Sequence, residues 1–593
     1  MSGSMTSLYV GVSGLKTSQN ALNTTAHNLA NIDTTGYTRQ QVIIKDNAYN
    51  TLSINHVSVN QVGSGTGIEL VRTVRDQFYD KQYRVEAGRQ GFYDVQYTAV
   101  CEIENVIGET EGEEFRASLD DLWTAFSELV NDSTDIVQRQ TTINTCKVFL
   151  ERAQQIQKQI DDYQESLNSE IIKKVNEINS IGEQIAELNV AIRRFEAGGV
   201  QNANDLRDSR NLLLDQLSSL VNISYKEAAD GTVHVSVEGV NFVDADSSIK
   251  MDVKELNENS TLLKPYWPSI DQDVYTNPGE YDSNQNTDVG SLKGLLAARG
   301  DYSADYTDIP KAPNKDDYAT DADYDAAVRA YEKEVEQYNK TVNASSIMSF
   351  QAKFDQLIHG VVTAINDILC PNATGYIVNA DGTKTAFQYL DEENAPIGMG
   401  DGNEIAGTEL FARSGTSRYQ EPVEMTFIDS NGNKVTKKVA IYNEEDPSDK
   451  ASLYTIDQIE VNKDLLANPN LLPLSNNKGT GDYDASVVEK INNIWNNAFS
   501  TLDPNSLTEY TFKEYYVALV GDIASRGNTF EVISENQDTM VNSINNSRIS
   551  ITGVSSEEEL SNLIKYQHAY NASSRYINTV SSMLETIINS FFS

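Results

Sequence analysis

Residues 5–29, MTSLYVGVSGLKTSQNALNTTAHNL, place a leucine at every seventh position and a second set of residues three positions before each leucine. Apolar residues that alternate at spacings of three and four form the seam of a coiled coil. The stretch has no proline, and its apolar stripe is too narrow for a helix that stands alone in a globular core. The leucines are Leu8, Leu15, Leu22 and Leu29, and the second set is Met5, Val12, Gln19 and Ala26.

The last forty residues carry the same kind of pattern, again without a proline. Each of the two terminal helices that we expect needs a partner to cover its stripe. The two ends therefore pair either with each other or with neighbouring copies of the chain. The C-terminal seam consists of Leu563, Tyr570, Ile577 and Leu584, with Tyr566, Ser573, Val580 and Ile587 three residues after them.

The segment that follows the first repeat carries a second signal. Its helical period ends at Asn31, and Asp33, Thr34, Thr35 and Gly36 favour turns and helix ends. An ordinary helix end would use the same residue types. The segment also resembles the signature of the flagellar axial proteins, the family of rod, hook and hook-associated subunits, which reads Ala-Asn-x-x-Thr-x-Gly-Tyr-x-Arg-Gln. The matching residues are Ala30, Asn31, Thr34, Gly36, Tyr37, Arg39 and Gln40.

Other stretches are similar to the hook-associated members of that family. They are residues 71–78, 205–220 and 290–301, whereas residues 562–572 resemble the C-terminal ending that the axial proteins share. The stretch 205–220 separates these members from the shorter rod proteins and from the hook subunit. Asn211 departs from the family pattern, which usually has aspartate there, and this departure weakens one possible ion pair.

The resemblance implies a structural subunit of the bacterial flagellum that joins the hook to the filament. Its implied partners are copies of itself in a ring, the hook subunit, the second junction protein (hook-associated protein 3) and a cytoplasmic export chaperone at the C-terminal helix. It also implies an extracellular location and export without a cleaved signal peptide. The assembly interface that we expect consists of Leu8, Val12, Leu15, Leu22, Leu29, Asn31, Gly36, Tyr37, Arg39, Gln40, Leu563, Tyr566, Tyr570, Ile577, Val580, Leu584 and Ile587.

Three alternatives stay open at this point. The chain could be another hook or distal-rod subunit of the same family. It could also be a secreted helical adhesin or effector, or a hydrolase carried on a flagellar scaffold. A metal-binding or nucleophile motif within residues 302–480 would favour the hydrolase, and the sequence holds none.

Composition narrows the class of protein. The formal net charge is −41. Residues 1–45 carry +2 and residues 555–593 carry −2, so the two ends together are neutral and residues 46–554 carry all of the −41. This sign argues against a nucleic-acid partner. No apolar run approaches the ~18 residues of a membrane helix, which argues against membrane insertion. The three cysteines are scattered and form no CxxC pair, which argues against a disulfide framework.

We expect no catalytic site, cofactor or metal. None of the five histidines belongs to a His-Glu-x-x-His pattern, and there is no Gly-x-Ser-x-Gly. The glycine-rich residues 63–70 lack the Lys-Ser/Thr of a phosphate-binding loop. The acidic residues 316–323 could bind calcium weakly, but they lack the EF-hand spacing, and a solvated loop is the better interpretation.

The expected fold is mainly α with β-rich inserts. All twelve prolines lie between Pro265 and Pro504, which leaves residues 1–264 and 505–593 free to be largely helical. Residues 137–195 hold a long apolar repeat that predicts one helix of roughly 85–90 Å, with a bent helical hairpin as the alternative. That length suits a rod-like subunit.

The expected domains are five. A terminal coiled coil consists of residues 1–45 and 555–593, and a long-helix bundle consists of residues 46–225, 347–370 and 483–554. A small β-containing segment covers residues 226–301, and an acidic surface insertion covers residues 302–346. A β-rich outer domain covers residues 371–482.

Overall fold

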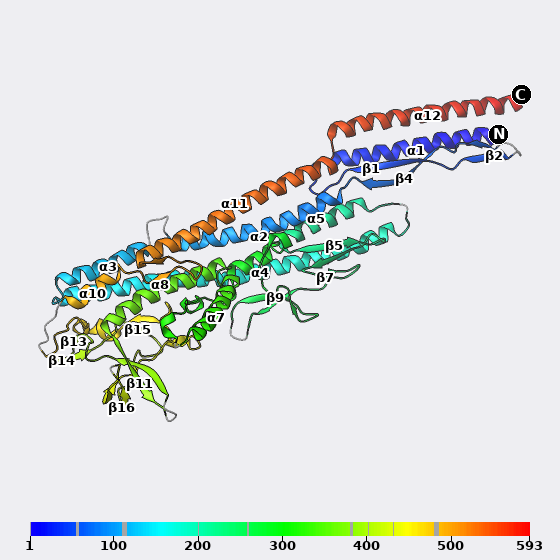
Figure 1. Ribbon diagram of the computed structural model, residues 1–593. Helices are drawn as coiled ribbons and strands as arrows, with labels where there is room; N and C mark the ends of the chain where they lie inside the picture. The colour runs from blue at the N-terminus through cyan, green and yellow to red at the C-terminus, as the bar shows by residue number, and fades with distance from the viewer. Residues whose placement is uncertain are drawn as a thin grey trace.

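The computed structural model describes residues 2–54, 59–108, 115–199, 201–257, 260–318, 320–379, 383–400, 402–430, 432–479 and 485–592. The molecule is elongated (Figure 1), with both termini at one end and short strands at the other. Long helices connect the two ends. This confirms a mainly α fold with β-rich inserts.

The longest helix, α4, runs without a break over Ile136–Glu196. Asp135 caps its start by accepting the amide of Val137, and Gly198 and Gly199 follow its end. Its 61 residues span about 92 Å. The long helix that the apolar repeat predicts is therefore confirmed, and the hairpin alternative is wrong. The seam residues Ile171, Ile178, Ile185 and Ile192 are buried.

The other body helices pack around α4 and bury a continuous apolar core. The helix α8 lies at the centre, and aromatic rings from four segments meet beside it, with Phe115 at 5.0–5.5 Å from Phe149, Phe354 and Tyr516. The body helices are α2 (Gln77–Ile107), α3 (Phe115–Asn131), α5 (Asn204–Leu220), α6 (Ser291–Arg299), α8 (Ser346–Leu369), α10 (Ser486–Ile494) and α11 (Phe512–Thr552). None of the described helices is long and apolar enough to span a bilayer.

Six short strands of the described chain lie between Ile223 and Asp273, largely within the segment 226–301 where we expected β structure, although residues 1–264 hold no proline that would prevent a helix. The absence of proline permits a helix but does not require one, and alternating residues such as Val233–Val237 follow the strand period instead. Two small antiparallel sheets, in the orders β5-β6-β7 and β10-β9-β8, lie against α4. Their strands are β5 (Ile223–Glu227), β6 (Val233–Val237), β7 (Val240–Val243), β8 (Asp252–Glu255), β9 (Leu263–Trp267) and β10 (Gln272–Asp273).

Residues 371–479, which we call the outer region, contain most of the remaining strands. Its largest sheet has the order β12-β11-β16-β17. The expected boundary between residues 482 and 483 lies outside the described residues. The elements are β11 (Asn372–Val378), β12 (Lys384–Leu390), β13 (Ile397–Gly400), β14 (Asn403–Ala406), β15 (Phe411–Arg413), β16 (Val423–Ile428), β17 (Lys434–Val439), β18 (Ile459–Val461), α9 (Lys463–Ala467), η4 (Lys450–Ser452) and η5 (Pro469–Leu471).

The acidic insertion differs from the solvated segment that we expected. Its helix α7 (Asp321–Lys340) is largely exposed, but Ala304, Ile309 and Tyr338 are buried against Met348 and Ala352 of α8. The insertion is not separate from the body, because its few apolar residues pack on α8. Further short elements in the described residues are η1 (Ser283–Gln285), η2 (Tyr306–Asp308), η3 (Lys315–Asp317), β19 (Ser500–Thr501) and β20 (Glu509–Tyr510).

A prediction concerns the contact between α4 and its small sheets. A Cβ at Gly182 would lie 2.4 Å from the buried ring of Phe242, whereas a Cβ at Gly521 of α11 would meet no atom within 4 Å. Alanine improves helix propensity by about 1 kcal/mol at both sites. Gly521→Ala should therefore raise the melting temperature. Gly182→Ala should lower stability by about 1–3 kcal/mol because of the clash.

Thermal unfolding of the two variants, followed by circular dichroism, checks this prediction. Because both variants replace a helical glycine by alanine, the gain in helix propensity is the same in both, and the difference in stability reports the surroundings of the two glycines. A Gly182→Ala protein as stable as Gly521→Ala would show that the α4–β7 contact is not as close as described.

Candidate assembly site at the terminal helices and their joint

The helices from the two ends of the chain lie side by side in antiparallel directions (Figure 1). They are α1 (Ser2–Ala30) and α12 (Ser556–Phe592). A Cβ on Gly11 would lie 2.7 Å from Ile577, and a Cβ on Gly14 would lie 2.9 Å from Ser573 Oγ. Near the other end of the pair, Asn28 donates to Glu559 at 3.2 Å. The pairing within one chain is therefore continuous along both helices.

The face that α1 turns to α12 differs from the expected leucine stripe. That face consists of small or polar residues at spacings of three and four. We call this row of residues the small-residue seam. The backbones come close there, and a leucine at Gly11 or Gly14 would collide with α12. The small-residue seam is Gly11, Gly14, Ser18, Ala21, Thr25 and Asn28.

The leucines occupy the flank of this contact. Leu8, Leu15, Leu22 and Leu29, together with Val12, are only half-buried in the single chain. Of the second set that we expected on the seam, Met5, Gln19 and Ala26 are exposed. The contact with α12 thus leaves an apolar stripe on α1 partly open.

On α12 the expected stripe does face α1. Val580 is buried, and Ile587 is 42% exposed near the end of the helix. The half-buried members of the stripe are Leu563, Tyr566, Tyr570, Ser573, Ile577 and Leu584. The C-terminal pattern therefore follows the helix pairing more closely than the N-terminal pattern.

A two-stranded sheet covers another side of α1. Its strands are β1 (Gln40–Asp46) and β4 (Thr66–Thr73), and β2 (Asn50–Ile54) pairs with β3 (Val59–Val62) further along. The hydroxyl of Thr17 donates to the carbonyl of Thr66 at 3.4 Å, and the amide of Thr66 donates to Ser13 at 3.2 Å. Ser13 and Thr17 of the N-terminal repeat thus have hydrogen-bond partners on this sheet.

The signature segment forms the turn that leads out of α1. Asn28 is buried, and its side chain joins this turn to α12. Its Oδ1 accepts the Tyr37 hydroxyl at 2.8 Å and the Gln40 amide at 2.9 Å, while its Nδ2 donates to the Gln40 carbonyl at 2.9 Å and to Glu559. Burial, followed by the nearby carboxylates, raises the pKa of Tyr37, so its hydroxyl keeps its proton to donate.

Arg39 ties the same turn to the start of α12. Its Nε lies 2.8 Å from Glu559, and a terminal nitrogen lies 2.7 Å from Glu558. The amide of Arg39 donates to the carbonyl of Thr552, the last residue of α11. Arg39 therefore fixes the break at Gly553, where α11 ends and α12 begins.

The other expected residues hold the turn against the body. Gly36 has φ +80°, and a Cβ at this position would lie 3.4–3.6 Å from the side chain of Leu212 on α5. Gln40 donates to Asp205 at 2.7 Å. Asn31 stays nearer the surface and accepts the hydroxyl of Thr34 at 3.2 Å. The structure thus brings together two of the stretches that carry the family resemblance, residues 30–40 and 205–220.

Three arginines and three aspartates connect the terminal pair to the body, and we call them the joint network. Arg75 pairs with Asp80 at 2.6 Å, and Arg84 and Arg548 each pair with Asp215 at 2.7 Å. These three contacts link the segment after β4 with α2, α5 and α11. The complete network is Arg75, Asp80, Arg84, Asp208, Asp215 and Arg548.

Asp208 links the network to the signature turn. Its Oδ2 accepts the amide of Thr38 at 2.9 Å, and Arg75 lies 3.5 Å from its other oxygen. Burial raises the pKa of Asp208 to about 6, although the Thr38 and Arg75 contacts lower it. Asn211, the departure from the family pattern, still accepts from Arg84 at 3.3 Å.

A cleft of about 720 Å³ lies at the joint. Its walls come from the signature turn, α2, α5 and the end of α11, and they include Arg75, Asp215 and Arg548. Among the described residues, no three carboxylate, imidazole or thiol groups lie close enough to hold a metal ion. The joint is thus a place where segments meet through ion pairs and hydrogen bonds.

Sequence reasoning missed several residues of this site. Asn28, Glu559, Asp208 and Arg548 all make buried or half-buried contacts at the joint. For Asn28 the sequence did hold a signal, because this polar residue lies on the same helix face as a row of small residues. For Arg548 there was none, since its ion-pair partners Asp80 and Asp215 lie more than 300 residues away in the sequence.

A prediction concerns the joint network. Arg548→Met keeps much of the side-chain volume but leaves Asp215 and Asp80 with one cation fewer. Hydrogen bonds to charged groups contribute about 1.5–3 kcal/mol each, so the variant should lose about that much stability. Lys158→Met removes an exposed ion pair with Asp162 on α4 and should change stability by less than about 1 kcal/mol.

Chemical denaturation of both variants gives the two free energies of unfolding. Equal stability of Arg548→Met and Lys158→Met would mean that the joint network contributes no more than a surface pair.

Comparison with known proteins supplies the family. A model described as the flagellar hook-associated protein FlgK helical domain matches residues 100–380. A model of flagella basal body rod proteins matches residues 8–38, and a model of the C-terminal part of the basal body rod FlgEFG proteins matches residues 539–590. The two short matches fall on α1 and on the end of α11 with α12.

The similarity to curated relatives extends over the full length. The chain is 25% identical to flagellar hook-associated protein 1 of Bacillus subtilis (strain 168), and the alignment covers 99% of each chain. It is 24% identical to the protein of that name from Escherichia coli (strain K12) and 23% identical to that from Salmonella typhimurium, with 98% of each chain covered.

Among solved structures, the flagellar hook junction protein FlgK from Burkholderia pseudomallei matches with a TM-score of 0.49 and 13% identity, over 79% of this chain and 100% of that chain. The full-length relatives and the three family models agree with the resemblance found in the sequence. The chain belongs to the flagellar hook-associated protein 1 family of flagellar axial proteins.

Proposed function

We propose that this chain is a structural subunit of the hook–filament junction and that it assembles through its terminal helix pair. The observation that carries this proposal is the leucine stripe of α1. Leu8, Leu15, Leu22 and Leu29 flank the contact with α12 and stay half-buried in the single chain. Neighbouring copies can cover this stripe, and covering it removes apolar surface from water.

The expected interface residues divide into two groups by their contacts. On α12, residues such as Ile577 and Ser573 already contact α1 in the same chain. In this proposal they hold the pair together, whereas the leucines of α1, Val12 and the exposed Ile587 contact other copies. The signature residues Asn31, Gly36, Tyr37, Arg39 and Gln40 set the direction of the pair.

The partners that we propose follow from the family and from charge. Copies of the chain in a ring, the hook subunit and hook-associated protein 3 would meet the terminal pair and the long helices. The charges of residues 1–45 and 555–593 cancel, so close packing of copies there carries little net repulsion. A cytoplasmic export chaperone would bind the exposed face of α12 before assembly.

The location that we propose is extracellular, at the junction, after export without a cleaved signal peptide. The family is one of structural flagellar proteins, and we propose that this member acts by packing alone, without catalysis.

The domain division is part of the same proposal. Residues 1–45 with 555–593 act as the assembly unit, and residues 46–225, 347–370 and 483–554 act as the rod-like spacer. Residues 226–301, 302–346 and 371–482 then lie outside this spacer. The helix α6 (Ser291–Arg299) falls within the segment 226–301, but it is buried in the core of the spacer. By its packing, α6 therefore belongs with the long helices.

Another hook or distal-rod subunit is the same-class alternative. The helical-domain model matches residues 100–380, and the stretch 205–220 lies within that range and contacts the signature turn through Asp205 and Asp208. These observations favour the junction protein over the other axial subunits.

A prediction tests the leucine stripe. Leu15→Asp places a carboxylate on a surface that must lose its water when copies pack, and the desolvation costs several kcal/mol. We expect hooks with no incorporated subunit and no filament in cells that make only this variant. Electron microscopy of isolated flagella measures the outcome.

Lys16→Asp is the matched control, because Lys16 is the next residue of α1 and is exposed. Cells with this control should grow filaments. Normal filaments in the Leu15→Asp strain would refute the assembly role of the stripe. Ile577→Asp should also fail, because its carboxylate would face the backbone at Gly11.

A further inference from the structure

The first part of the acidic insertion lies between the helical body and the outer region. Residues 302–309, which we call the strap, follow α6 and precede α7. At one end, Ser303 donates to Asp161 of α4 at 2.9 Å, and the amide of Ala304 donates to Gln351 of α8 at 3.2 Å. The strap is thereby fixed to two body helices before it reaches the outer region.

A single buried carboxylate of α8 holds the strap and the outer region at once. Asp355 is 3% exposed. One of its oxygens accepts the amide of Tyr306 in the strap at 3.0 Å, and the other accepts the amide of Ile456 in the outer region at 2.7 Å. Burial holds the pKa of Asp355 well above its ordinary value, although the two amides lower it. Removal of either segment would leave a buried oxygen without a donor, which is costly.

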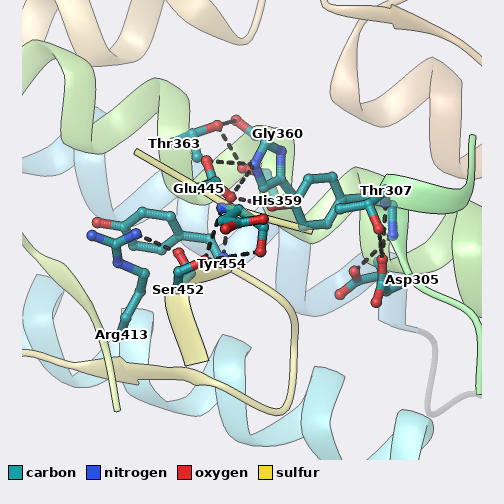
Figure 2. Close-up of polar contacts among 12 residues, drawn as sticks. Asp305, Thr307, His359, Gly360, Thr363, Arg413, Glu445, Ser452 and Tyr454 are labelled. Carbon is teal, nitrogen blue, oxygen red and sulfur yellow. Dashed lines mark hydrogen bonds and ion pairs between the residues drawn. The ribbon is translucent and has the colours of Figure 1, made fainter. Parts of the chain in front are cut away.

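A carboxylate from the outer region makes the reciprocal contact. Glu445 accepts the hydroxyl of Tyr306 and lies 3.2 Å from His359 Nε2 of α8. It also accepts the amide of Tyr454 at 3.2 Å. Figure 2 shows Glu445 and His359 turned toward each other from separate segments. The ring of Tyr306 stacks on that of His359 with centroids 3.8 Å apart.

The pKa of Glu445 reflects these contacts. Burial alone would raise it, but His359, the Tyr306 hydroxyl and the Tyr454 amide lower it to about 2. The carboxylate form is therefore favoured in the folded chain. The stability that it contributes is present above the ordinary glutamate pKa and is lost as the pH falls toward 2.

The loop that carries Glu445 is itself held in place. Arg413 donates to the carbonyl of Ser452, and also to that of Asn443 at 3.0 Å, and its guanidinium lies 4.8 Å from the ring centre of Tyr454 (Figure 2). Glu445 is thus presented to the strap by a loop that Arg413 contacts at Asn443, Ser452 and Tyr454.

We propose that the strap is an internal docking surface that fixes the outer region on the helical body, with Tyr306, Asp355 and Glu445 as its positioning residues. Each of the two carboxylates receives hydrogen bonds from two other segments, so the three segments are joined in one place. The insertion therefore acts as a structural tie, and its acidic helix α7 is the exposed part that follows it.

Amide hydrogen exchange on the purified full-length chain tests this proposal without any need for assembly. Tyr306→Phe keeps the ring that stacks on His359 and removes the hydroxyl that Glu445 accepts. A hydrogen bond to a charged group contributes enough that its loss should speed local opening about tenfold or more. Peptides within 443–458 should therefore exchange about tenfold faster, while peptides within 171–192 of α4 keep the wild-type rate.

Tyr318→Phe is the matched control, since Tyr318 is an exposed tyrosine of the same insertion. It should leave exchange within 443–458 unchanged. A second arm combines Tyr306→Phe with Glu445→Gln. If the two side chains act together, losing both should have little more effect than losing one. The amides of residues 443–458 in the double variant should then exchange at most about threefold faster than in whichever single variant exchanges faster.

Two results would overturn the proposal. One is a Tyr306→Phe protein whose 443–458 peptides exchange within twofold of wild type. The other is a double variant in which the two effects multiply, because independent effects would show that the hydroxyl and the carboxylate do not act on each other.

Discussion

The close approach of α1 and α12 is the constraint on which the rest of this structure depends. Two helices from opposite ends of a 593-residue chain can come this near because Gly11 and Gly14 have no side chain between the backbones. Larger residues on that face would hold the helices apart. Because the small residues occupy the contact, the leucines of α1 are left on its flank, where they are only half-buried. The same geometry thus pairs the two ends and leaves apolar surface for other copies.

The direction of this pair depends on polar contacts at the joint. Asn28 and Arg39 fix the signature turn to Glu559 at the start of α12, and the joint network connects the turn to the body. Polar groups that are buried require partners with defined geometry, so such contacts specify one arrangement more strictly than apolar packing does. At the other end of the molecule, the strap uses buried carboxylates in a similar way to place the outer region.

Periodicity in the sequence predicted the long elements well and the contacts between them poorly. The apolar repeat predicted α4 because a helix of that length buries the same face at every turn. The N-terminal repeat predicted α1 but pointed to the leucines, since apolar patterning carries no signal for a seam of glycine, serine and alanine. The ion pairs of Arg548 and the strap contacts of Tyr306 join residues far apart in sequence, and no local pattern reveals them. The signature residues were found through the family resemblance, whereas their partners Asp208 and Glu559 required the structure.

Disulfide formation between Gly14→Cys and Ser573→Cys tests the pairing of the ends most directly. A Cβ at position 14 would lie 3.8 Å from the Cβ of Ser573, which is close to the distance in a disulfide. Gly14→Cys with Asn578→Cys, on the exposed face of α12, serves as the control. The account predicts that flagella isolated after mild oxidation contain the first variant as a monomer cross-linked within one chain, and the control uncross-linked. A first variant that is linked between chains, or no more readily than the control, would contradict it.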